Sequence, residues 1–472
     1  MAPIPWLDWN EDAFRRARES GRPILLALVA PWSSWSRRME REAYADSEVA
    51  RLVETGFVAV RVDADRRPDI NDRYSPGAVP ATAFLDPDGV LLYATTYLDA
   101  DELKRLLVEF STRYEANRGQ VAEAVRGRDA KIAQILRARY AGPGIAIEEM
   151  VPRTLEGILA DFDPIHGGFG RGAKLPLPAS LLFLAETLHA GGDPRAKPVL
   201  EKSLDAIWRG LWDPIDGGFF AGCAGDGWTR PSTEKLLDVN AGLMPALLEA
   251  GRHDRALATA QWIVNTLYDS ERRAFMGSQA ADEEYYSRDA AERAKMAKPE
   301  IDRTVYTDRS ALASSAFLAT GDPTLADAAT RALEHVLGHQ RDAHYEGGGI
   351  GLLRDRVALG HALLDIGTVL EAERLGADLF AEHGSAEERG LLDRRPGVEE
   401  LGELSRKRSD PGETGSGARF LLRLAKAAGE PRYRADAARI LRGVPDFGPD
   451  WGHATAEIAR AARLLLEGGG EA

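Results

Sequence analysis

Two nearly identical octapeptides begin 50 residues apart in this 472-residue chain: DPIHGGFG at Asp163 and DPIDGGFF at Asp213. Weaker echoes of the same glycine-rich turn follow at 272–277, 345–351 and 445–452. A turn that recurs at such a period is typical of architectures in which one supersecondary unit stacks against copies of itself. The repeat therefore constrains most of the chain to a solenoid or a closed ring.

The segments between these turns have the periodicity of helices, and strand signals nearly vanish after residue 140. The pattern predicts six helical hairpins. Their helices are expected at 146–161, 177–190, 196–211, 232–250, 254–268, 307–319, 324–338, 355–369, 371–383, 414–428, 432–443 and 451–467.

These predicted helices are of two kinds. Stretches such as PASLLFLAETL (178–188) and ARFLLRLAKAA (418–428) are apolar almost all round, whereas the helix after Pro198 has a single apolar stripe. A helix that is apolar all round is buried, and a striped helix faces water on one side. Their alternation predicts two concentric rings, an all-α (α/α)6 toroid over residues 141–472. An open helical solenoid is the alternative.

Residues 1–112 alternate apolar runs with helical segments and predict a thioredoxin-like α/β domain. ILLALVA (24–30) and FVAVRVDA (57–64) are typical of buried strands, and 81–97 is typical of a β-hairpin. Ser33 and Ser36 follow the first strand, where that fold begins its redox helix. Pro80 stands where the fold carries a cis-proline. Residues 99–118 are predicted as its last helix, and residues 113–140 as a charged helical connector to the toroid.

Both halves of the chain resemble the spermatogenesis-associated protein 20 family, in which a thioredoxin-like domain precedes a large helical domain. In the first half the resemblance is carried by WSSWSRRMEREAY (32–44) and VPATAFLDPDG (79–89). In the second half it is carried by GGFGRGAKLPLP (167–178), WTRPSTEKLLDVNA (228–241) and LLRDRVALGHALLD (352–365). The family's helical domain is similar to six-hairpin glycosidases and to sugar epimerases of the N-acylglucosamine type. The resemblance thus implies a six-hairpin glycosidase-like toroid.

The resemblance breaks down at the redox motif, where the family has Cys-His-Trp-Cys-His and this chain has Ser-Ser-Trp-Ser-Arg from Ser33 to Arg37. Disulfide exchange requires a thiolate that attacks sulfur, and a serine hydroxyl cannot form a disulfide. We therefore predict a redox-inactive member in which serine caps the following helix. A serine nucleophile is the alternative, and the absence of histidine from residues 1–165 disfavours it.

Acidic residues gather where the glycine turns lead into the predicted inner helices. Glu234 and Asp238, four residues apart in one predicted helix, share a face. Asp308 and Asp355 open two further helices, and Glu413 lies beside another. Glycoside hydrolysis needs two carboxylates, about 5–5.5 Å apart for retention or about 6.5–9.5 Å apart for inversion. Glu234, Asp238 and Asp308 are the candidate catalytic residues, although acids in a first turn also stabilise the helix dipole.

Aromatic residues near the same turns are candidates for stacking on a sugar ring, although packing is the commoner role of aromatic residues at turns. The candidate substrate-binding residues are Asp355 and four aromatic residues, Trp228, Phe169, Phe219 and Tyr306. Epimerases of the related fold use histidines as proton carriers, and Ser232 stands where the family has a histidine. His361, on an apolar helix, is expected to be a core residue.

Charge and composition exclude several classes of function. Sixty Lys and Arg against 74 Asp and Glu give a net charge of −14, which disfavours binding to nucleic acid or to an anionic membrane. No apolar run is long enough to span a bilayer, and the N-terminus has no signal-peptide pattern. Because Cys223 is the single cysteine, we expect a cytoplasmic protein. No His/Cys cluster has zinc spacing, so neither a metal nor another cofactor is expected.

Together these features predict a degenerate protein with a carbohydrate-related binding or scaffold role. Replacement of both cysteines, and of the histidine at Ser232, favours this hypothesis because two separate sites have lost their electron or proton carriers. The alternative is a sugar-active enzyme of the glycoside hydrolase or epimerase type that uses toroid carboxylates. The expected partners are a small sugar or glycoside and a protein that binds the thioredoxin-like domain.

Overall fold

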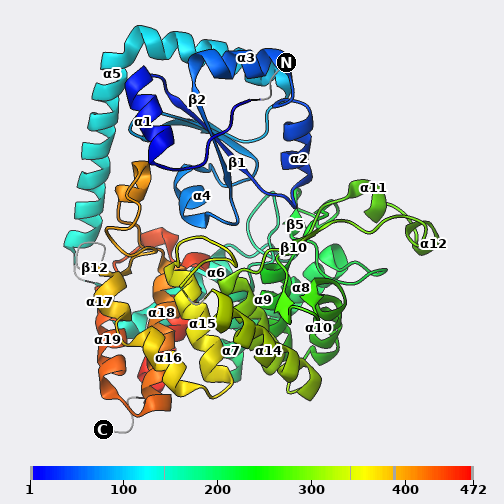
Figure 1. The fold of residues 1–472 in the computed structure, drawn as a ribbon. Helices are drawn as coiled ribbons and strands as arrows, with labels where there is room; N and C mark the ends of the chain where they lie inside the picture. The colour runs from blue at the N-terminus through cyan, green and yellow to red at the C-terminus, as the bar shows by residue number, and fades with distance from the viewer. Residues whose placement is uncertain (1–3, 143, 341, 386–389, 469–472) are drawn as a thin grey trace. The chain divides into compact units, whose positions relative to one another are not determined.

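The computed structural model describes residues 4–142, 144–340, 342–385 and 390–468, and the chain divides into two compact units (Figure 1). The α/β unit comprises residues 1–141 and 396–407, and the helical unit comprises 142–395 and 408–472. The first boundary lies one residue from the predicted start of the toroid. Segment 396–407, which the sequence places in the toroid, belongs instead to the α/β unit.

The α/β unit is built on a four-stranded sheet in the order β2-β1-β3-β4. Strands β1 and β2 are parallel, whereas β3 is antiparallel to both β1 and β4. Every residue of β1 and β3 is buried, because α1 and α4 cover one face of the sheet and α2, α3 and α5 cover the other. This is the predicted thioredoxin-like arrangement. Its elements are α1 (Glu11–Ser20), β1 (Ile24–Val29), α2 (Ser34–Arg41), α3 (Ser47–Gly56), β2 (Val58–Asp63), α4 (Pro68–Tyr74), β3 (Ala81–Leu85), β4 (Leu91–Thr95) and α5 (Ala100–Ala141).

The last helix of this unit is longer than the sequence predicts. The helix expected at 99–118 and the connector expected at 113–140 form one 42-residue helix, α5, whose backbone leaves the helical region at Asn117. The connector is therefore part of the α/β unit. Over the described ranges, even a helix of this length lacks the apolar stretch needed to cross a membrane.

Segment 396–407 completes the core of the α/β unit. Leu404 is buried in the apolar cluster formed by α1, α4 and the sheet. The Arg67 guanidinium donates to both carboxylate oxygens of Glu399. The buried hydroxyl of Tyr74 donates to the Gly89 carbonyl (2.7 Å) and accepts from the Glu403 amide (2.7 Å). A segment distant in sequence thus supplies both apolar and polar partners to α4.

We expect Tyr74→Phe to destabilise the α/β unit by about 1–3 kcal/mol, because the buried Gly89 carbonyl and Glu403 amide lose their common partner. Urea unfolding followed by circular dichroism measures the change. Tyr93→Phe is the matched control, since the Tyr93 side chain is 47% exposed. Equal unfolding midpoints for the two variants would contradict the role given to this hydroxyl.

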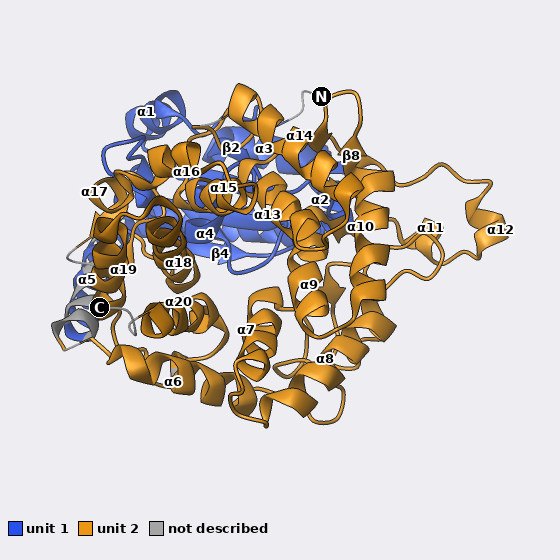
Figure 2. Cartoon of the chain, turned by 90° about the horizontal axis from the view of Figure 1, so that it is seen from below, with its two compact units in different colours: residues 1–141, 396–407 blue, residues 142–395, 408–472 orange. Residues whose placement is uncertain are grey.

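In the part of the helical unit that the structure describes, six inner helices form a closed ring and six outer helices surround it (Figure 2). Each inner helix packs against the next, and the last packs against the first, which excludes an open solenoid. The inner helices are α7 (Pro178–His189), α9 (Leu237–Glu249), α13 (Thr307–Leu318), α15 (Leu353–Asp365), α18 (Pro411–Ala428) and α20 (Ala456–Glu467). The outer helices are α6 (Ile147–Ala160), α8 (Ala196–Leu211), α10 (His253–Leu267), α14 (Pro323–His339), α16 (Val369–Gly376) and α19 (Pro431–Gly443).

The loops that lead into the inner helices carry short additional elements. The predicted helix at 232–250 begins only at Leu237, because β7 pairs with β10 as a strand. The predicted helix at 371–383 is broken into two, α16 and α17. The loop elements are β5 (Gly222–Cys223), β6 (Pro231–Ser232), β7 (Lys235–Leu236), β8 (Tyr268–Asp269), β9 (Ala274–Phe275), β10 (Ser278–Gln279), α11 (Glu283–Tyr286), α12 (Ala290–Arg293), β11 (Ile301–Asp302), α17 (Leu379–His383), β12 (Gly384–Ser385) and β13 (Gly390–Leu391).

The two octapeptides fold into the same turn. The Asp163 carboxylate accepts hydrogen bonds from the amides of Ile165 (2.8 Å) and His166 (3.0 Å), and the Asp213 carboxylate accepts one from Ile215 (3.0 Å). Each aspartate amide donates to a glycine carbonyl five residues later. Gly167 has a φ of 77°, in the left-handed region that favours glycine. The sequence repeat is thus a repeat of backbone conformation.

A buried lysine neutralises each of these aspartates. Lys174 Nζ lies 2.8 Å from Asp163 Oδ2, and Lys235 Nζ lies 2.7 Å from Asp213 Oδ2. Both lysine side chains are fully buried. Each lysine lies in the segment that leads into an inner helix, Lys174 four residues before α7 and Lys235 two residues before α9. The ion pairs therefore tie each glycine turn to the chain segment that enters the ring.

We expect Lys174→Met to destabilise the helical unit by about 3 kcal/mol, since removal of one partner leaves the Asp163 charge without its buried counterion. Thermal unfolding monitored by tryptophan fluorescence measures this loss. Lys197→Met is the matched control, because the Lys197 side chain is 67% exposed. A Lys174→Met protein as stable as the control would show that the pair does not hold the turn.

Candidate functional site

The six inner helices surround a cavity of about 760 Å³ within the helical unit. Every inner helix contributes to its lining, and most of the charged lining residues come from α13, α15, α18 and α20. A cavity of this volume is typical of small-molecule sites. The charged residues in the lining are Asp238, Asp308, Arg309, Arg354, Asp365, Glu413, Arg419, Arg423, Glu457 and Arg460.

The structure separates the three candidate catalytic residues. Asp238 and Asp308 line the cavity. Glu234 is not among the lining residues, and its backbone carbonyl accepts a hydrogen bond from the Ala221 amide (2.9 Å). The prediction that Glu234 and Asp238 share a helical face is wrong, because α9 begins at Leu237 and Glu234 precedes it.

Glu413, at the start of α18, is the cavity acid with the most unusual environment. Its Oε1 accepts hydrogen bonds from Arg354 Nε (2.9 Å) and Nη2 (2.7 Å), while the buried Oε2 has no hydrogen-bond partner among the described residues. Burial raises the pKa of Glu413 to about 7, and Asp410 and Asp393 add to this against the pull of Arg354. Glu413 can therefore hold or release a proton near neutral pH.

Glu457, on α20, has the opposite character. Its carboxylate accepts from Arg419 Nε (3.1 Å) and from the Arg460 guanidinium. Although burial opposes ionisation, Arg460 and Arg419 hold the pKa of Glu457 at about 2. The cavity thus combines a fixed carboxylate with a titratable one.

His361 lines the cavity but has no free ring nitrogen. Arg423 Nη1 donates to its Nδ1 (3.0 Å), which leaves the Nε2 proton to be donated to the Ser416 carbonyl (3.2 Å). Burial lowers the pKa of His361 well below its usual value, and the nearby Arg419 and Arg423 charges lower it further. This is the satisfied core histidine that the sequence led us to expect, held in its neutral form.

Three residues from separate segments converge beside the cavity. One ligand atom each of Asp308, His344 and Asp355 lies within 4.8 Å of the other two. His344 Nδ1 is 2.8 Å from Asp355 Oδ1, and Asp355 Oδ2 accepts from the Leu352 amide (2.9 Å) at the start of α15. Burial raises the pKa of Asp355, and Asp308 adds to the effect. The trio could coordinate a cation, and its members are too far apart in sequence to form a recognisable spacing.

The four candidate stacking residues lie in the core. The most exposed of them, Trp228, is only 5% exposed. Its Nε1 donates to the Gly167 carbonyl (3.0 Å), and the Phe219 ring packs edge-on against Trp208 and Trp212. None of the four lines the cavity, whose described lining holds no Trp, Tyr or Phe, and the predicted substrate-binding Asp355 is also outside it. The residues concerned are Trp228, Phe169, Phe219, Tyr306 and Asp355.

In the α/β unit Ser33 caps α2, whereas Ser36 bonds to the segment that follows β1. Ser33 Oγ accepts from the Ser36 amide (3.2 Å) at the start of α2, and Ser36 Oγ accepts from the Ala30 amide (3.2 Å). Both serines are buried, and the Val79–Pro80 peptide bond is cis as expected. The capping role of Ser33 is therefore confirmed.

Sequence comparison finds a family match for the first part of the chain and two relatives of the chain. Residues 1–133 match the family described as Thioredox_DsbH, a protein of unknown function. The chain is 29% identical over 253 residues to an uncharacterised protein of Caenorhabditis elegans and 25% identical over 275 residues to spermatogenesis-associated protein 20 of Homo sapiens. The resemblance to the spermatogenesis-associated protein 20 family is confirmed. The matches cover 50% and 52% of this chain but only 34% of each relative's length.

Solved structures resemble the helical unit. Cellobiose 2-epimerase from Spirochaeta thermophila is 16% identical with a TM-score of 0.52, over 73% of this chain and 98% of its own. A D-mannose isomerase is 9% identical with a TM-score of 0.53, over 68% of this chain and 97% of its own. At these identities the likeness is one of fold, and it confirms the predicted six-hairpin glycosidase-like toroid.

We expect the stability of the protein to depend on the protonation of Glu413. Between its ordinary pKa of 4.5 and about 7, folded Glu413 holds a proton that the unfolded chain releases, so its contribution to the free energy of unfolding falls as pH rises through this window. Glu413→Gln should remove this loss. The free energy of unfolding of the variant should therefore rise relative to that of wild type by on the order of 3 kcal/mol between pH 4.5 and 7.5.

Denaturant unfolding of both proteins at the two pH values provides the measurement. Glu334→Gln is the matched control, since Glu334 is an exposed acid on α14. A difference between wild type and Glu413→Gln that does not change with pH would contradict the raised pKa.

Proposed function

We propose that the helical unit binds a small, sugar-like molecule in the cavity between its inner helices and that the protein has a binding or scaffold role. The observation that carries this proposal is the cavity of about 760 Å³, whose lining presents both carboxylates and guanidinium groups from the inner helices. Such groups can accept from and donate to sugar hydroxyls. The two solved structures with this fold are named as acting on sugars, which adds support by analogy of fold.

The state of the cavity histidine favours binding over epimerase-type catalysis. Proton transfer by histidine needs a ring nitrogen that can accept a proton, and both nitrogens of His361 are engaged. Ser232 also stands where the family has a histidine. The absence of aromatic residues from the described lining means that recognition rests on polar groups rather than on stacking.

A glycoside hydrolase activity is the second candidate, and Glu413 is the observation that favours it. A general acid needs a carboxyl that keeps its proton near neutral pH, and the pKa of Glu413 is raised to about 7 by burial. Its Oε2 has no hydrogen-bond partner in the described chain. Asp308, which lines the same cavity, is the second carboxylate of this proposal.

For the α/β unit we propose a role without dithiol chemistry. The buried hydroxyl of Ser36 accepts a hydrogen bond from a backbone amide, and neither serine can form a disulfide. Trp35 is 50% exposed and packs edge-on against Tyr97, with the Arg38 guanidinium over both rings. We propose the exposed Trp35, supported by the partly buried Tyr97, as the contact point for a protein partner, in a cytoplasmic setting suited to a chain whose one cysteine is free.

A calorimetric titration with cellobiose, mannose and glucose tests the proposal. We expect at least one sugar to bind the full chain, and Asp308→Asn to weaken that binding about tenfold or more through loss of a charged hydrogen-bond acceptor. Glu334→Gln is the control and should bind as wild type does. Lack of binding by every sugar in a broad panel would count against the proposal.

Product analysis separates the two candidate functions. Binding without change of the sugar supports the binding role. Hydrolysis of a glycoside that disappears in Glu413→Gln, while binding persists, supports the hydrolase role.

A further inference from the structure

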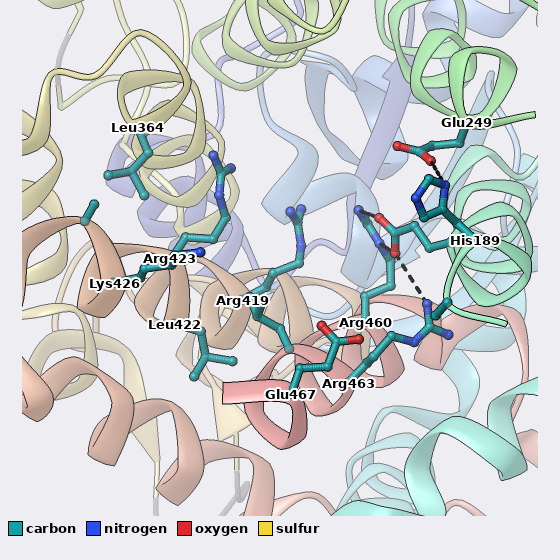
Figure 3. Close-up of a pocket in the computed structure, with 14 residues that line it drawn as sticks. His189, Glu249, Leu364, Arg419, Leu422, Arg423, Lys426, Arg460, Arg463 and Glu467 are labelled. Carbon is teal, nitrogen blue, oxygen red and sulfur yellow. Dashed lines mark hydrogen bonds and ion pairs between the residues drawn. The ribbon is translucent and has the colours of Figure 1, made fainter. Parts of the chain in front are cut away.

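A second cavity, of about 840 Å³, lies at the C-terminal ends of the inner helices (Figure 3). Arg419, Arg423 and Arg460 line both cavities. The two cavities therefore form one continuous space inside the ring of inner helices, which we call the bore. Asp308 and Glu413, the two acids named in the proposals for sugar binding and hydrolysis, do not line this second cavity.

Five cationic side chains enter this cavity from two neighbouring helices. Arg419, Arg423 and Lys426 of α18 are spaced four and three residues apart and share one helical face. Arg460 and Arg463 of α20 are three residues apart on the adjoining helix, and α18 packs against α20. Figure 3 shows the two sets extending from their helices into the same pocket.

Some of these cations are already paired. Arg460 donates to both oxygens of Glu186 (2.8 and 2.6 Å) and also to Glu457. Arg423 donates to His361 and to Asp365. Their guanidinium groups are therefore held in place by the protein's own acceptors.

The others keep unused donors. Arg419 donates through Nε alone, to Glu457 (3.1 Å), and its two terminal nitrogens have no acceptor among the described residues. Arg463 Nη2 donates to the Thr187 hydroxyl, while its buried Nη1 lacks a hydrogen-bond partner and lies 4.0 Å from Glu186 Oε2. Lys426 makes no ion pair with any described residue.

The acids beside these cations are mostly engaged away from Lys426 and from the free nitrogens of Arg419 and Arg463. Glu186 accepts from Arg460, Glu457 from Arg419 and Arg460, and Asp365 from Arg423, while Glu249 lies 3.6 Å from the imidazole of His189. Burial lowers the pKa of the Arg419 guanidinium, and the positive charge of Arg460 lowers it further. Burial also lowers the pKa of Arg463. An anion bound here would relieve this repulsion.

We propose that this end of the bore binds a small molecule through a phosphate group, with Arg419 and Arg463 as hydrogen-bond donors and Lys426 as a point charge. Guanidinium groups match the oxygens of phosphate in paired hydrogen bonds, and lysine adds a compact positive charge. Donors that approach from two helices suit a tetrahedral anion better than a planar carboxylate. Leu364, Leu422 and Leu464 line the remaining wall and would contact an organic body.

Arg463 and Lys426 separate this proposal from the sugar-binding proposal, because they line only this cavity, whereas Arg419 lines both. Calorimetric titration of the full chain with inorganic phosphate, glucose 6-phosphate and glucose tests it. We expect phosphate-bearing probes to bind and to weaken as ionic strength rises. Tighter binding of glucose 6-phosphate than of inorganic phosphate identifies a phosphorylated organic ligand, and equal binding identifies free phosphate.

Two variants locate the site. Arg419→Met should weaken phosphate binding about tenfold or more, since charged hydrogen bonds are lost, and Lys426→Met should weaken it severalfold. Lys426 is exposed and unpaired, so its replacement leaves the fold intact even if Arg419→Met proves unstable. Arg331→Met, which alters an exposed arginine on α14, is the control. Failure of both phosphate probes to bind, or unchanged affinity in Lys426→Met, overturns the proposal.

Discussion

The architecture of the helical unit depends on carboxylates held at its glycine turns. Asp163 and Asp213 each accept backbone amide protons within the turn and pair with a buried lysine. Burial works against their ionisation, yet these donors hold the pKa of both below the usual range. Asp269 and Asp446 also accept backbone amide hydrogen bonds and pair with arginines, although both arginines and Asp446 are exposed, and backbone donors are the largest cause of their lowered pKa. A charge buried at such a turn is tolerable only with its counterion in place.

Because these turns direct the chain into the inner helices, they also determine what the bore contains. First-turn acids such as Asp308 and Glu413 face the cavity at one end, and arginines of α18 and α20 occupy its middle and other end. The same fold thereby holds two carboxylates in opposite states. Glu457 is ionised between Arg419 and Arg460, whereas burial leaves Glu413 able to keep its proton near neutral pH. The protonation state of each acid in the bore therefore depends on how many cations lie beside its carboxyl group.

Much of the fold was predictable, and the errors have physical causes. The helices expected at 196–211 and 307–319 end within a residue of α8 and α13, because apolar periodicity reports burial directly. The sequence predicts a helix at Glu234 because β7 is too short to interrupt the apolar periodicity. The strand β7 forms by pairing with Ser278 and Gln279, which lie in a distant loop. The sequence predicts that Trp228 stacks on a sugar ring, but its side chain packs against the backbone at Gly168 and Gly210, where the absence of a side chain leaves room for it.

The sequence by itself determined the two folds, the order in which they occur and the loss of sulfur at Ser33 and Ser36, since these follow from local patterns and from residue identity. Only the tertiary structure decided that segment 396–407 completes the α/β core, that His361 is neutral and that Glu413 titrates near neutral pH. It also decided that arginines of two helices share one cavity. Burial and charge depend on distances between side chains remote in sequence, and local periodicity carries no information about those distances.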